Sequence, residues 1–399
     1  MKSYKIKDLI SEKISGEWGI EPSQNRSVKV LRTTNFTNSG KINYDKVVLR
    51  DIDNSLVEKK KLKLGDIIIE KSGGSPKQPV GRVVFFDAKS DDIFLCNNFT
   101  AILRPQNTVF PKFLFYSLFY NHLIKKTLKF QNKTTGILNL QLERYLNEKV
   151  TIPSLPEQKR IADLLDKVDS VRQKRKESIT LLDELLRSMF LDMFGDPVRN
   201  EKGWEKKQFK SIVEDYDYGL SNKADEDNTG IPMLRMNNIT YEGRIDISKL
   251  KYINKSKFDF QKYKLIKNDF LFNRTNSPEL VGKCSVWNSE QEITFAGYLI
   301  RFRFVKNIAN PYFVSHYFNS SFGKKFLYTK ARPSINMSNI SASTLMGFPI
   351  LIPPIKLQTQ FAKIVEQVEV TKAGMEESLR EMDNQFEGLM QKAFVEDFL

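Results

Sequence analysis

Two stretches of the chain, residues 156–197 and 356–399, carry apolar side chains at alternating steps of three and four residues. This spacing places the apolar positions along one face of an α-helix and is typical of the seam between paired helices. One step in each stretch breaks the alternation, at residues 171–179 and 371–379, which indicates a stutter. The stripe positions are Ile161, Leu164, Val168, Val171, Arg175, Ile179, Leu182, Leu186, Met189 and Met193, and then Phe361, Ile364, Val368, Thr371, Met375, Leu379, Met382, Phe386, Leu389 and Ala393.

A single amphipathic stripe usually packs against its own domain. Two stripes of equal length with matching stutters each offer the other a partner, so we expect one antiparallel helix pair, with globular domains at its opposite ends. A helix of about 35 residues would be roughly 50 Å long. The basic residues 172–176 predict a solvated face, with Arg175 on the seam as a possible polar lock on the register.

Outside these stretches the pattern changes to short apolar runs between Gly, Asn and Ser turns. The runs predict β-strands at Lys29–Arg32, Asp66–Glu70 and Arg82–Phe86, and again at Pro232–Arg235 and Phe270–Phe272. An apolar helix is predicted after Pro111 and another after Pro311, because proline is favoured in the first turn of a helix. Each globular part is therefore predicted to be a mixed α+β domain.

The chain is an internal repeat of about 200 residues. Residues 31–42 align without gaps on residues 234–245, with six of twelve identical, and Ile152-Pro153 recurs as Ile352-Pro353. We predict an α+β fold of two tandem domains, residues 1–155 and 198–355, separated by helices at 156–197 and 356–399 that form an antiparallel coiled coil. Residues 43–64 and 246–267 are nearly unrelated, so the two domains are expected to bind different targets.

Composition narrows the class of protein. The chain has 399 residues and a net charge of +15, with two cysteines and two histidines. Residues 156–200 have a net charge of 0 and residues 351–399 of −4, so the remainder carries +19. Two separate basic blocks suggest that both domains face a polyanion, and nucleic acid is the first candidate.

Other classes are disfavoured by what the sequence lacks. The longest apolar run, near residues 113–124, is shorter than the roughly 20 residues that a membrane span needs, and the charged N-terminus does not resemble a signal peptide. Two cysteines cannot build a disulfide framework. We therefore expect a soluble protein of the reducing cytoplasm with no membrane partner.

A catalytic centre is not expected in this chain. It has no phosphate-binding P-loop, no dinucleotide fingerprint and no zinc-binding His-Glu-x-x-His. Asn310-Pro311-Tyr312-Phe313 approaches an adenine methyltransferase motif but lacks its second proline, and the repeat partner of this segment is a plain helix start. Asp66 and Glu70 could suggest a metal nuclease, yet Asn273 replaces Glu70 in the second copy, which favours a structural role for the aspartates in a turn before a strand.

Polar loops are the better candidates for binding. Residues 71–77 are glycine-rich and flanked by lysines, so their backbone N–H groups could bind a phosphate, although a solvated turn explains the same residues. Residues 131–136 and 330–334 are rich in side chains that read base edges. The DNA-contact candidates are Arg32, Lys71, Ser72, Lys77, Arg82, Gln131, Asn132, Lys133 and Thr134 in the first copy, and Arg235, Asn273, Arg274, Asn276, Lys283, Arg332 and Ser334 in the second.

With its repeat and motifs in view, the chain resembles the specificity subunit of a Type I restriction-modification system. Each helical stretch opens with Ile-Pro-x-x-x-x-Gln, at residues 152–158 and 352–358. The family's Pro-x-x-Glu-Gln is intact in the first copy, whereas Leu357 replaces Glu in the second. Residues 186–197 resemble the family's junction between halves, and residues 65–69 followed by 80–82 resemble its recognition-domain core.

The resemblance implies a function that the composition could not give. Such subunits are not enzymes; each recognition domain reads one half of an asymmetric bipartite site on double-stranded DNA, and the helices set the spacer and dock two methyltransferase subunits. Restriction and translocase subunits join for cleavage, so S-adenosylmethionine, ATP and Mg²⁺ are expected on the partners, with no catalytic, cofactor or metal residues here. A recognition subunit of a Type IIB-like or other defence complex, and a coiled-coil scaffold that does not bind DNA, are the alternatives.

Overall fold

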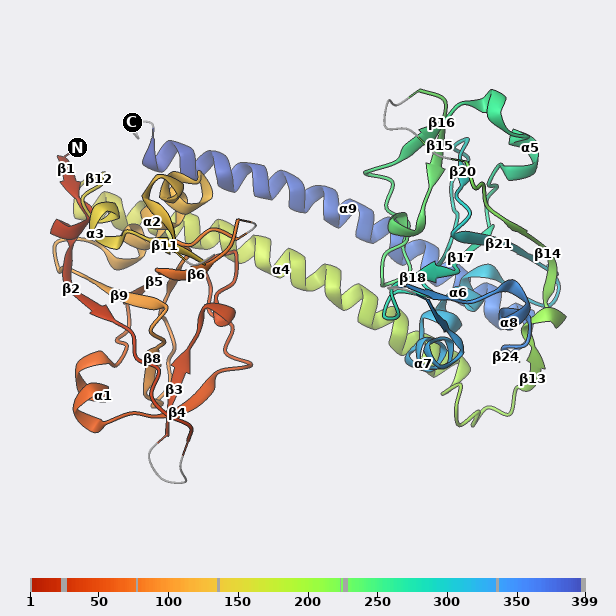
Figure 1. Cartoon of the computed structure of the whole chain (residues 1–399), viewed down its shortest axis with the longest axis horizontal. Coiled ribbons are helices and arrows are strands. Elements are labelled where there is room, and N and C mark those ends of the chain that lie inside the picture. The colour runs from red at the N-terminus through yellow and green to blue at the C-terminus, as the bar shows by residue number, and fades with distance from the viewer. Residues whose placement is uncertain are drawn as a thin grey trace. The chain divides into compact units, whose positions relative to one another are not determined.

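The computed structural model describes residues 2–22, 27–76, 78–134, 137–222, 224, 229–334 and 337–395, with the backbone alone for residues 133, 134, 333 and 334. The chain divides into two compact units, Met1–Arg175 with Ser378–Leu399, and Lys176–Glu377. Each of the two long helices therefore contributes one part to each unit (Figure 1). Across the described ranges, no helix is both long and apolar enough to cross a membrane.

The first unit is built on an antiparallel sheet with the strand order β2–β9–β5–β7. Its strands are β2 (Ile10–Ser15), β5 (Ile67–Glu70), β7 (Val83–Phe85) and β9 (Thr100–Pro105). The other pairings are β4–β3–β8, β10–β11–β6 and β1–β12. These involve β1 (Lys2–Lys5), β3 (Ser27–Leu31), β4 (Val48–Asp51), β6 (Ser72–Gly74), β8 (Phe94–Cys96), β10 (Gln131–Thr134), β11 (Ile137–Leu140) and β12 (Lys149–Ile152). The shorter helices are α1 (Asn54–Lys60), α2 (Pro111–Leu123) and α3 (Leu142–Tyr145).

The second unit repeats this topology strand for strand. Its main sheet has the order β14–β21–β17–β19, and the other pairings are β16–β15–β20, β18–β23–β22 and β13–β24. The strands are β13 (Glu205–Gln208), β14 (Val213–Tyr218), β15 (Ile231–Leu234), β16 (Lys251–Ile253), β17 (Phe270–Asn273), β18 (Thr275–Asn276), β19 (Cys284–Val286), β20 (Thr294–Phe295), β21 (Leu299–Phe304), β22 (Arg332–Ser334), β23 (Met337–Asn339) and β24 (Pro349–Ile352). The helices are α5 (Phe260–Tyr263), α6 (Pro311–Asn319), α7 (Ser321–Lys330) and α8 (Ala342–Met346). The predicted repeat, strands and proline-initiated helices are confirmed.

The position of helix α2 in the fold explains why its sequence has no polar face. Residues 113–121 are all buried, because α2 lies between the main sheet and the long helices. Phe115 packs on Phe85 of β7 with ring centroids 5.6 Å apart, and Phe113 packs on Phe394 of the last helix at 5.4 Å. In the second unit the equivalent Phe313 contacts Phe194 at 4.7 Å. A helix buried on two faces has no polar side to show, so its sequence lacks the amphipathic pattern.

The two long helices are α4 (Leu155–Phe194) and α9 (Ile355–Phe394), each of 40 residues and so about 60 Å long. They run antiparallel: Arg172 of α4 meets Asp383 of α9 in the first unit, and Asp183 of α4 meets Lys372 of α9 in the second. This confirms the predicted antiparallel helix pair, with helices slightly longer than expected.

Most side chains of the predicted helix-pair seam are buried or partly buried. Val171 and Thr371 are the exceptions, because Val171 is 51% exposed and Thr371 is also exposed. The following residues, Arg172 and Lys372, face inward instead. The assignment of a polar lock to Arg175 is likewise corrected, since Arg172 makes the cross-helix ion pair. The buried or partly buried seam residues are Ile161, Leu164, Val168, Ile179, Leu182, Leu186, Phe361, Ile364, Val368, Leu379, Met382 and Phe386.

Candidate nucleic-acid interface

The two polar loops of the first unit, about 60 residues apart in sequence, lie in one three-stranded sheet. Strand β6 comes from the glycine-rich residues 71–77, and β10 and β11 form the hairpin around residues 131–140. The central strand β11 pairs antiparallel with both neighbours, and Asn139 lies opposite Ser72. The Ser72 hydroxyl donates to Asn139 Oδ1 at 2.5 Å. Residues 72–74 of the glycine-rich stretch are therefore a strand that joins the hairpin, whereas Ser75 and Pro76 are exposed at the start of a turn that the Ser75–Gln78 bridge closes.

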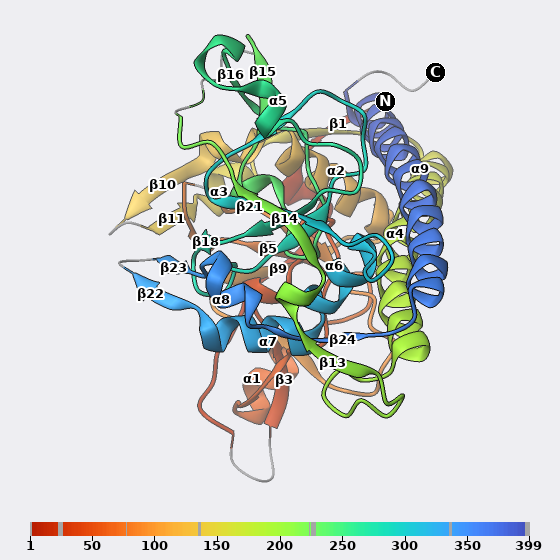
Figure 2. The same cartoon turned by 90° about the vertical axis from the view of Figure 1, so that its right-hand side faces the viewer.

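The second unit builds the same sheet from its own loops. Strand β18 pairs with β23, and β23 pairs with β22. Thr275 lies opposite Asn339, and the Thr275 hydroxyl bonds to the Asn339 amide oxygen. Figure 2 shows hairpin β10–β11 extending away from the long helices of its own unit, and β22–β23 doing the same in the second unit. Each unit thus has one projecting polar hairpin supported by a strand from the core.

Several first-unit candidates are at least partly accessible on this sheet and its surroundings. Lys71 is partly buried, its ammonium donates to Ser15 Oγ at 3.1 Å, and burial lowers the pKa of this group. Gln131 donates to the Val80 carbonyl at 2.8 Å, and Asn132 is exposed. Arg32 donates to the Lys46 carbonyl at 3.1 Å. Ser72 is bonded to Asn139 as described, Lys77 lies outside the described residues, and of Lys133 and Thr134 only the strand backbone is described.

In the second unit, Arg235 and Arg274 line one cavity of about 520 Å³. Its other described lining residues are Leu220, Ser221, Asn222, Ala224, Met233, Met236, Asn237, Lys251, Ala296, Gly297 and Tyr298. Arg332 is exposed on β22, and of Ser334 only the backbone is described. Arg235, Lys251 and Arg274 bring three basic side chains to this lining, so the cavity suits an anionic or acceptor-rich ligand.

Four candidates lie in the interior, contrary to the expectation that they contact DNA. Arg82 is 8% exposed and its guanidinium makes two bonds of 2.9 Å to Glu70, with further bonds to the carbonyls of Thr33 and Phe36. In the second unit Asn273, Asn276 and Lys283 are 0%, 7% and 7% exposed. Lys283 Nζ donates to the Met236 carbonyl at 3.1 Å. Arg82 and Lys283 thus have partners inside their units, as buried polar groups usually do. Asn273 and Asn276 accept the N–H groups of Thr275 and Ser277 at 3.2 and 2.9 Å, whereas their amide nitrogens have no hydrogen-bond partner among the described residues.

The aspartates before the core strands have the structural role that the repeat indicated. Asp66 accepts the Lys63 N–H at 2.8 Å and binds Arg104 through two bonds of 2.9 Å. Asp269 accepts the Ile266 N–H at 3.0 Å and binds Arg303. Each aspartate thus closes the turn that leads into its strand. The described part of the chain contains no group of three or more His, Cys, Asp or Glu residues placed to hold a metal ion.

The comparison with known proteins decides the family. The sequence profile of the Type I restriction modification DNA specificity domain matches twice, at residues 1–181 and 201–381. The chain belongs to this family. It is 26% identical over 393 residues to the specificity subunit of the Type I restriction enzyme EcoKI of Escherichia coli, covering 92% of this chain and 81% of that protein.

Two further relatives agree with the assignment. The StySPI specificity subunit of Salmonella potsdam is 26% identical over 394 residues, covering 93% of this chain and 82% of that protein. The crystal structure of the Type I restriction-modification S subunit from M. genitalium shares the fold, with a TM-score of 0.59, 16% identity, and coverage of 100% of this chain and 96% of that one. The match over both copies identifies a specificity subunit with two recognition domains in tandem.

The structure gives a physical reason for the glutamine in the family's Ile-Pro-x-x-x-x-Gln element. Gln158 is 2% exposed; it accepts the Phe110 N–H at 2.8 Å and donates to the Pro153 carbonyl at 3.0 Å. Gln358 makes the equivalent bonds, accepting from Asn310 N–H at 2.9 Å. Each glutamine ties the start of its long helix to the loop before the proline-initiated helix. Among the residues that the structure describes, Glu157 pairs with Arg160 alone, at the surface, which explains how Leu357 can replace it.

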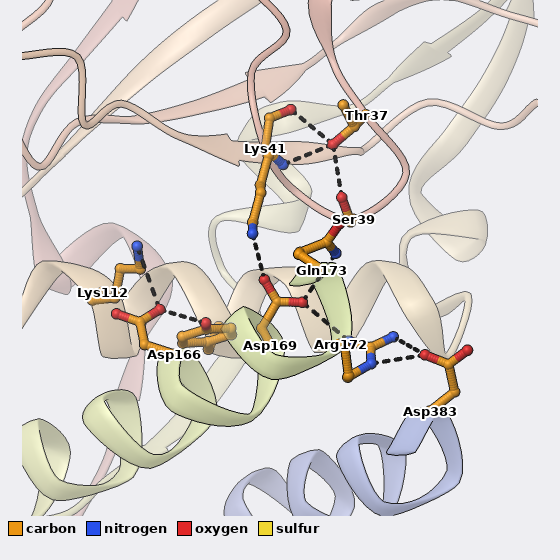
Figure 3. Close-up of polar contacts among 10 residues, drawn as sticks. Thr37, Ser39, Lys41, Lys112, Asp166, Asp169, Arg172, Gln173 and Asp383 are labelled. Atoms are coloured by element: carbon orange, nitrogen blue, oxygen red, sulfur yellow. Dashed lines mark hydrogen bonds and ion pairs between the residues drawn. The ribbon is translucent and has the colours of Figure 1, made fainter. Parts of the chain in front are cut away.

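A polar network that the sequence analysis missed joins the first recognition domain to both long helices (Figure 3). Lys41 binds Asp169 at 2.9 Å, Asp169 binds Arg172 at 3.1 Å, and Arg172 Nε donates to Asp383 at 2.7 Å. The Arg172 guanidinium also lies over the Phe386 ring, 4.2 Å from its centroid. The charged residues were visible in the sequence, but a heptad pattern that counts apolar positions overlooks cations whose stems pack inside.

Proposed function

We propose that this specificity subunit reads an asymmetric bipartite site on double-stranded DNA, with one recognition domain for each half-site. The observation that carries the proposal is the duplicated interface: each unit places a projecting polar hairpin and a strand from its core in one sheet. Arg, Lys, Asn and Gln side chains on and around these sheets are of the types that read base edges and bind phosphates.

The two half-sites should differ because the corresponding side chains differ. Lys71 stands where the second domain has Arg274, and Ser15 stands where it has Tyr218. An Arg and a Lys are not equivalent in recognition, since only the guanidinium presents a rigid planar fork of donors. We therefore expect two unlike half-sites and not a palindrome.

The helix pair is assigned the role of fixing the spacing between half-sites and docking two methyltransferase subunits. Two antiparallel helices of 40 residues support this role, because a long paired helix resists bending more than a single one. We assign S-adenosylmethionine to the methyltransferase subunits, and ATP and Mg²⁺ to the restriction and translocase subunits, with no chemistry on this chain.

The test is to produce the full chain together with the methyltransferase subunit of its own system and to map N6-methyladenine across the host genome. A split motif with two unlike halves and a fixed gap is expected. A continuous or palindromic motif would overturn the bipartite reading, and a stable complex that methylates nothing would overturn the function.

A binding measurement separates DNA recognition from a scaffold role. If the complex neutralises several phosphates, its affinity for duplex DNA should fall by roughly three to five orders of magnitude between about 50 and 200 mM salt. A weak salt dependence would favour the scaffold that does not bind DNA.

A further inference from the structure

Arg274 and Lys71 occupy the same place in the backbone of the two units. Each joins a core strand to the strand that supports the polar hairpin: Arg274 lies between β17 and β18, and Lys71 lies between β5 and β6. The Arg274 N–H donates to the Tyr298 carbonyl at 3.0 Å, and the Lys71 N–H donates to the Phe99 carbonyl at 2.9 Å. The two side chains therefore start from equivalent backbone positions and can be compared directly.

The side chains are held in different ways. The Lys71 ammonium is bonded to the Ser15 hydroxyl, whereas the Arg274 guanidinium lies over the Tyr218 ring, 4.9 Å from its centroid. Stacking on a ring fixes the plane of the guanidinium and leaves its outer N–H groups free to point along that plane. The arginine is thus oriented before any ligand arrives.

Three arginines of the second unit form ion pairs with aspartates among the described residues, and Arg274 is not one of them. Arg244, Arg301 and Arg303 are paired with Asp183, Asp217 and Asp269 respectively. Arg274 has no ion pair among the described residues, and its Nε is buried without a hydrogen-bond partner there. A partly buried cation without an acceptor is costly, and this cost is removed when a ligand supplies the acceptor.

The cavity beside Arg274 presents hydrogen-bond donors to such a ligand. Arg235, whose Nε is also buried and unpartnered among the described residues, lines the same space of about 520 Å³. The lining includes Tyr298, which is 49% exposed, and Asn237, and none of the described lining residues carries a negative charge. The cavity therefore offers donors from two guanidinium groups together with an aromatic ring.

Building on the proposed function, we propose that Arg274 is a specificity-determining residue of the second recognition domain and reads a guanine of its half-site. Guanine is the base that presents two hydrogen-bond acceptors, O6 and N7, side by side in the major groove, and the guanidinium fork matches this pair. A phosphate contact would also use an arginine, but it would carry no sequence information. The two possibilities differ in what a substitution does to the recognised motif.

The experiment maps N6-methyladenine in cells that produce the full chain with its methyltransferase, comparing the wild type with Arg274→Ala and Arg274→Gln. The matched control is Lys267→Ala, which removes one exposed positive charge from the same unit at a residue that does not line the cavity. Both Arg274 variants should lose guanine selection at one position of one half-site, by on the order of ten- to a hundred-fold. The glutamine variant should also gain adenine there, because an amide pairs with adenine N6 and N7.

The other half-site should remain unchanged in both variants, which shows that the variant subunit still folds and assembles. An unchanged motif with methylation reduced equally at all sites would identify a phosphate contact and overturn the proposal. So would a wild-type second half-site that contains no guanine. A wild type that yields no bipartite motif at all would instead overturn the proposed function, so the two failures are distinguishable.

Discussion

The buried ion pair between Lys372 and Asp183 gives a sharp test of how the long helices are held together. Lys372 is 1% exposed, and Asp183 is the only carboxylate with which it forms an ion pair among the described residues. Asp183→Asn would leave a positive charge inside the helix pair without a counter-charge. Breaking a buried pair in this way costs about 3–5 kcal/mol, and the partial exposure of Asp183 places the expected loss near the lower value, about 3 kcal/mol.

The repeat supplies a matched control at Asp383. Arg172 is the equivalent of Lys372, but it binds Asp169 at 3.1 Å as well as Asp383, and it also lies over the Phe386 ring. Asp383→Asn therefore leaves the arginine with a second carboxylate, and we expect a loss of only about 1 kcal/mol. The same substitution at two equivalent positions should thus differ several-fold in its effect on stability.

The assay combines urea denaturation of the purified full chain with amide hydrogen exchange measured by mass spectrometry. Exchange should accelerate in residues 176–194 and 355–377 for Asp183→Asn, and much less in residues 155–175 and 378–394 for Asp383→Asn. Adding Lys372→Met to Asp183→Asn should recover most of the lost stability, because it removes the buried ammonium, while Arg244, the other partner of Asp183, keeps its ion pair with Glu376. Equal losses for the two asparagine variants, or no recovery in the double variant, would refute the reasoning.

Three further outcomes follow from the structure. Gln158→Leu should lower the free energy of unfolding by about 1–3 kcal/mol, because it leaves a buried backbone N–H unpaired, whereas Glu157→Ala in the same urea titration should change it by less than about 0.5 kcal/mol. Gly374→Ala and Gly388→Ala should each raise the stability of α9 by up to about 1 kcal/mol, seen as a higher Tm, because an added Cβ meets nothing within 4 Å. Burial holds the pKa of His122 at about 4, below its ordinary 6.5, so the unfolded chain binds the extra proton between these values. The free energy of unfolding should therefore fall by about 2 kcal/mol between pH 7 and pH 5, and His122→Gln should flatten this decline in urea titrations.

The sequence by itself determined the repeat, the two long helices and the class of the recognition domains. These features follow from local and periodic signals: apolar steps of three and four residues, prolines in the first turn of α2 and α6, and the alternation of short apolar runs with turns. The structural role of Asp66 could also be inferred from the sequence. The second copy keeps an aspartate at this position, Asp269, but has Asn273 where the first copy has Glu70. Such signals can be recognised from the sequence alone, because each depends on residues close together in the chain.

Only the tertiary structure decided which polar residues are available to a ligand. Arg82 and Arg274 are both basic residues near glycine- or asparagine-rich turns, yet Arg82 is buried against Glu70 and Arg274 lies over Tyr218 beside a cavity. The partner of each cation comes from a different strand or helix, so composition cannot tell the two apart. The same holds for Arg172, whose ion pair with Asp383 joins residues 211 positions apart. Burial and pairing of charges are properties of contacts between distant segments, and those contacts exist only once the chain has folded.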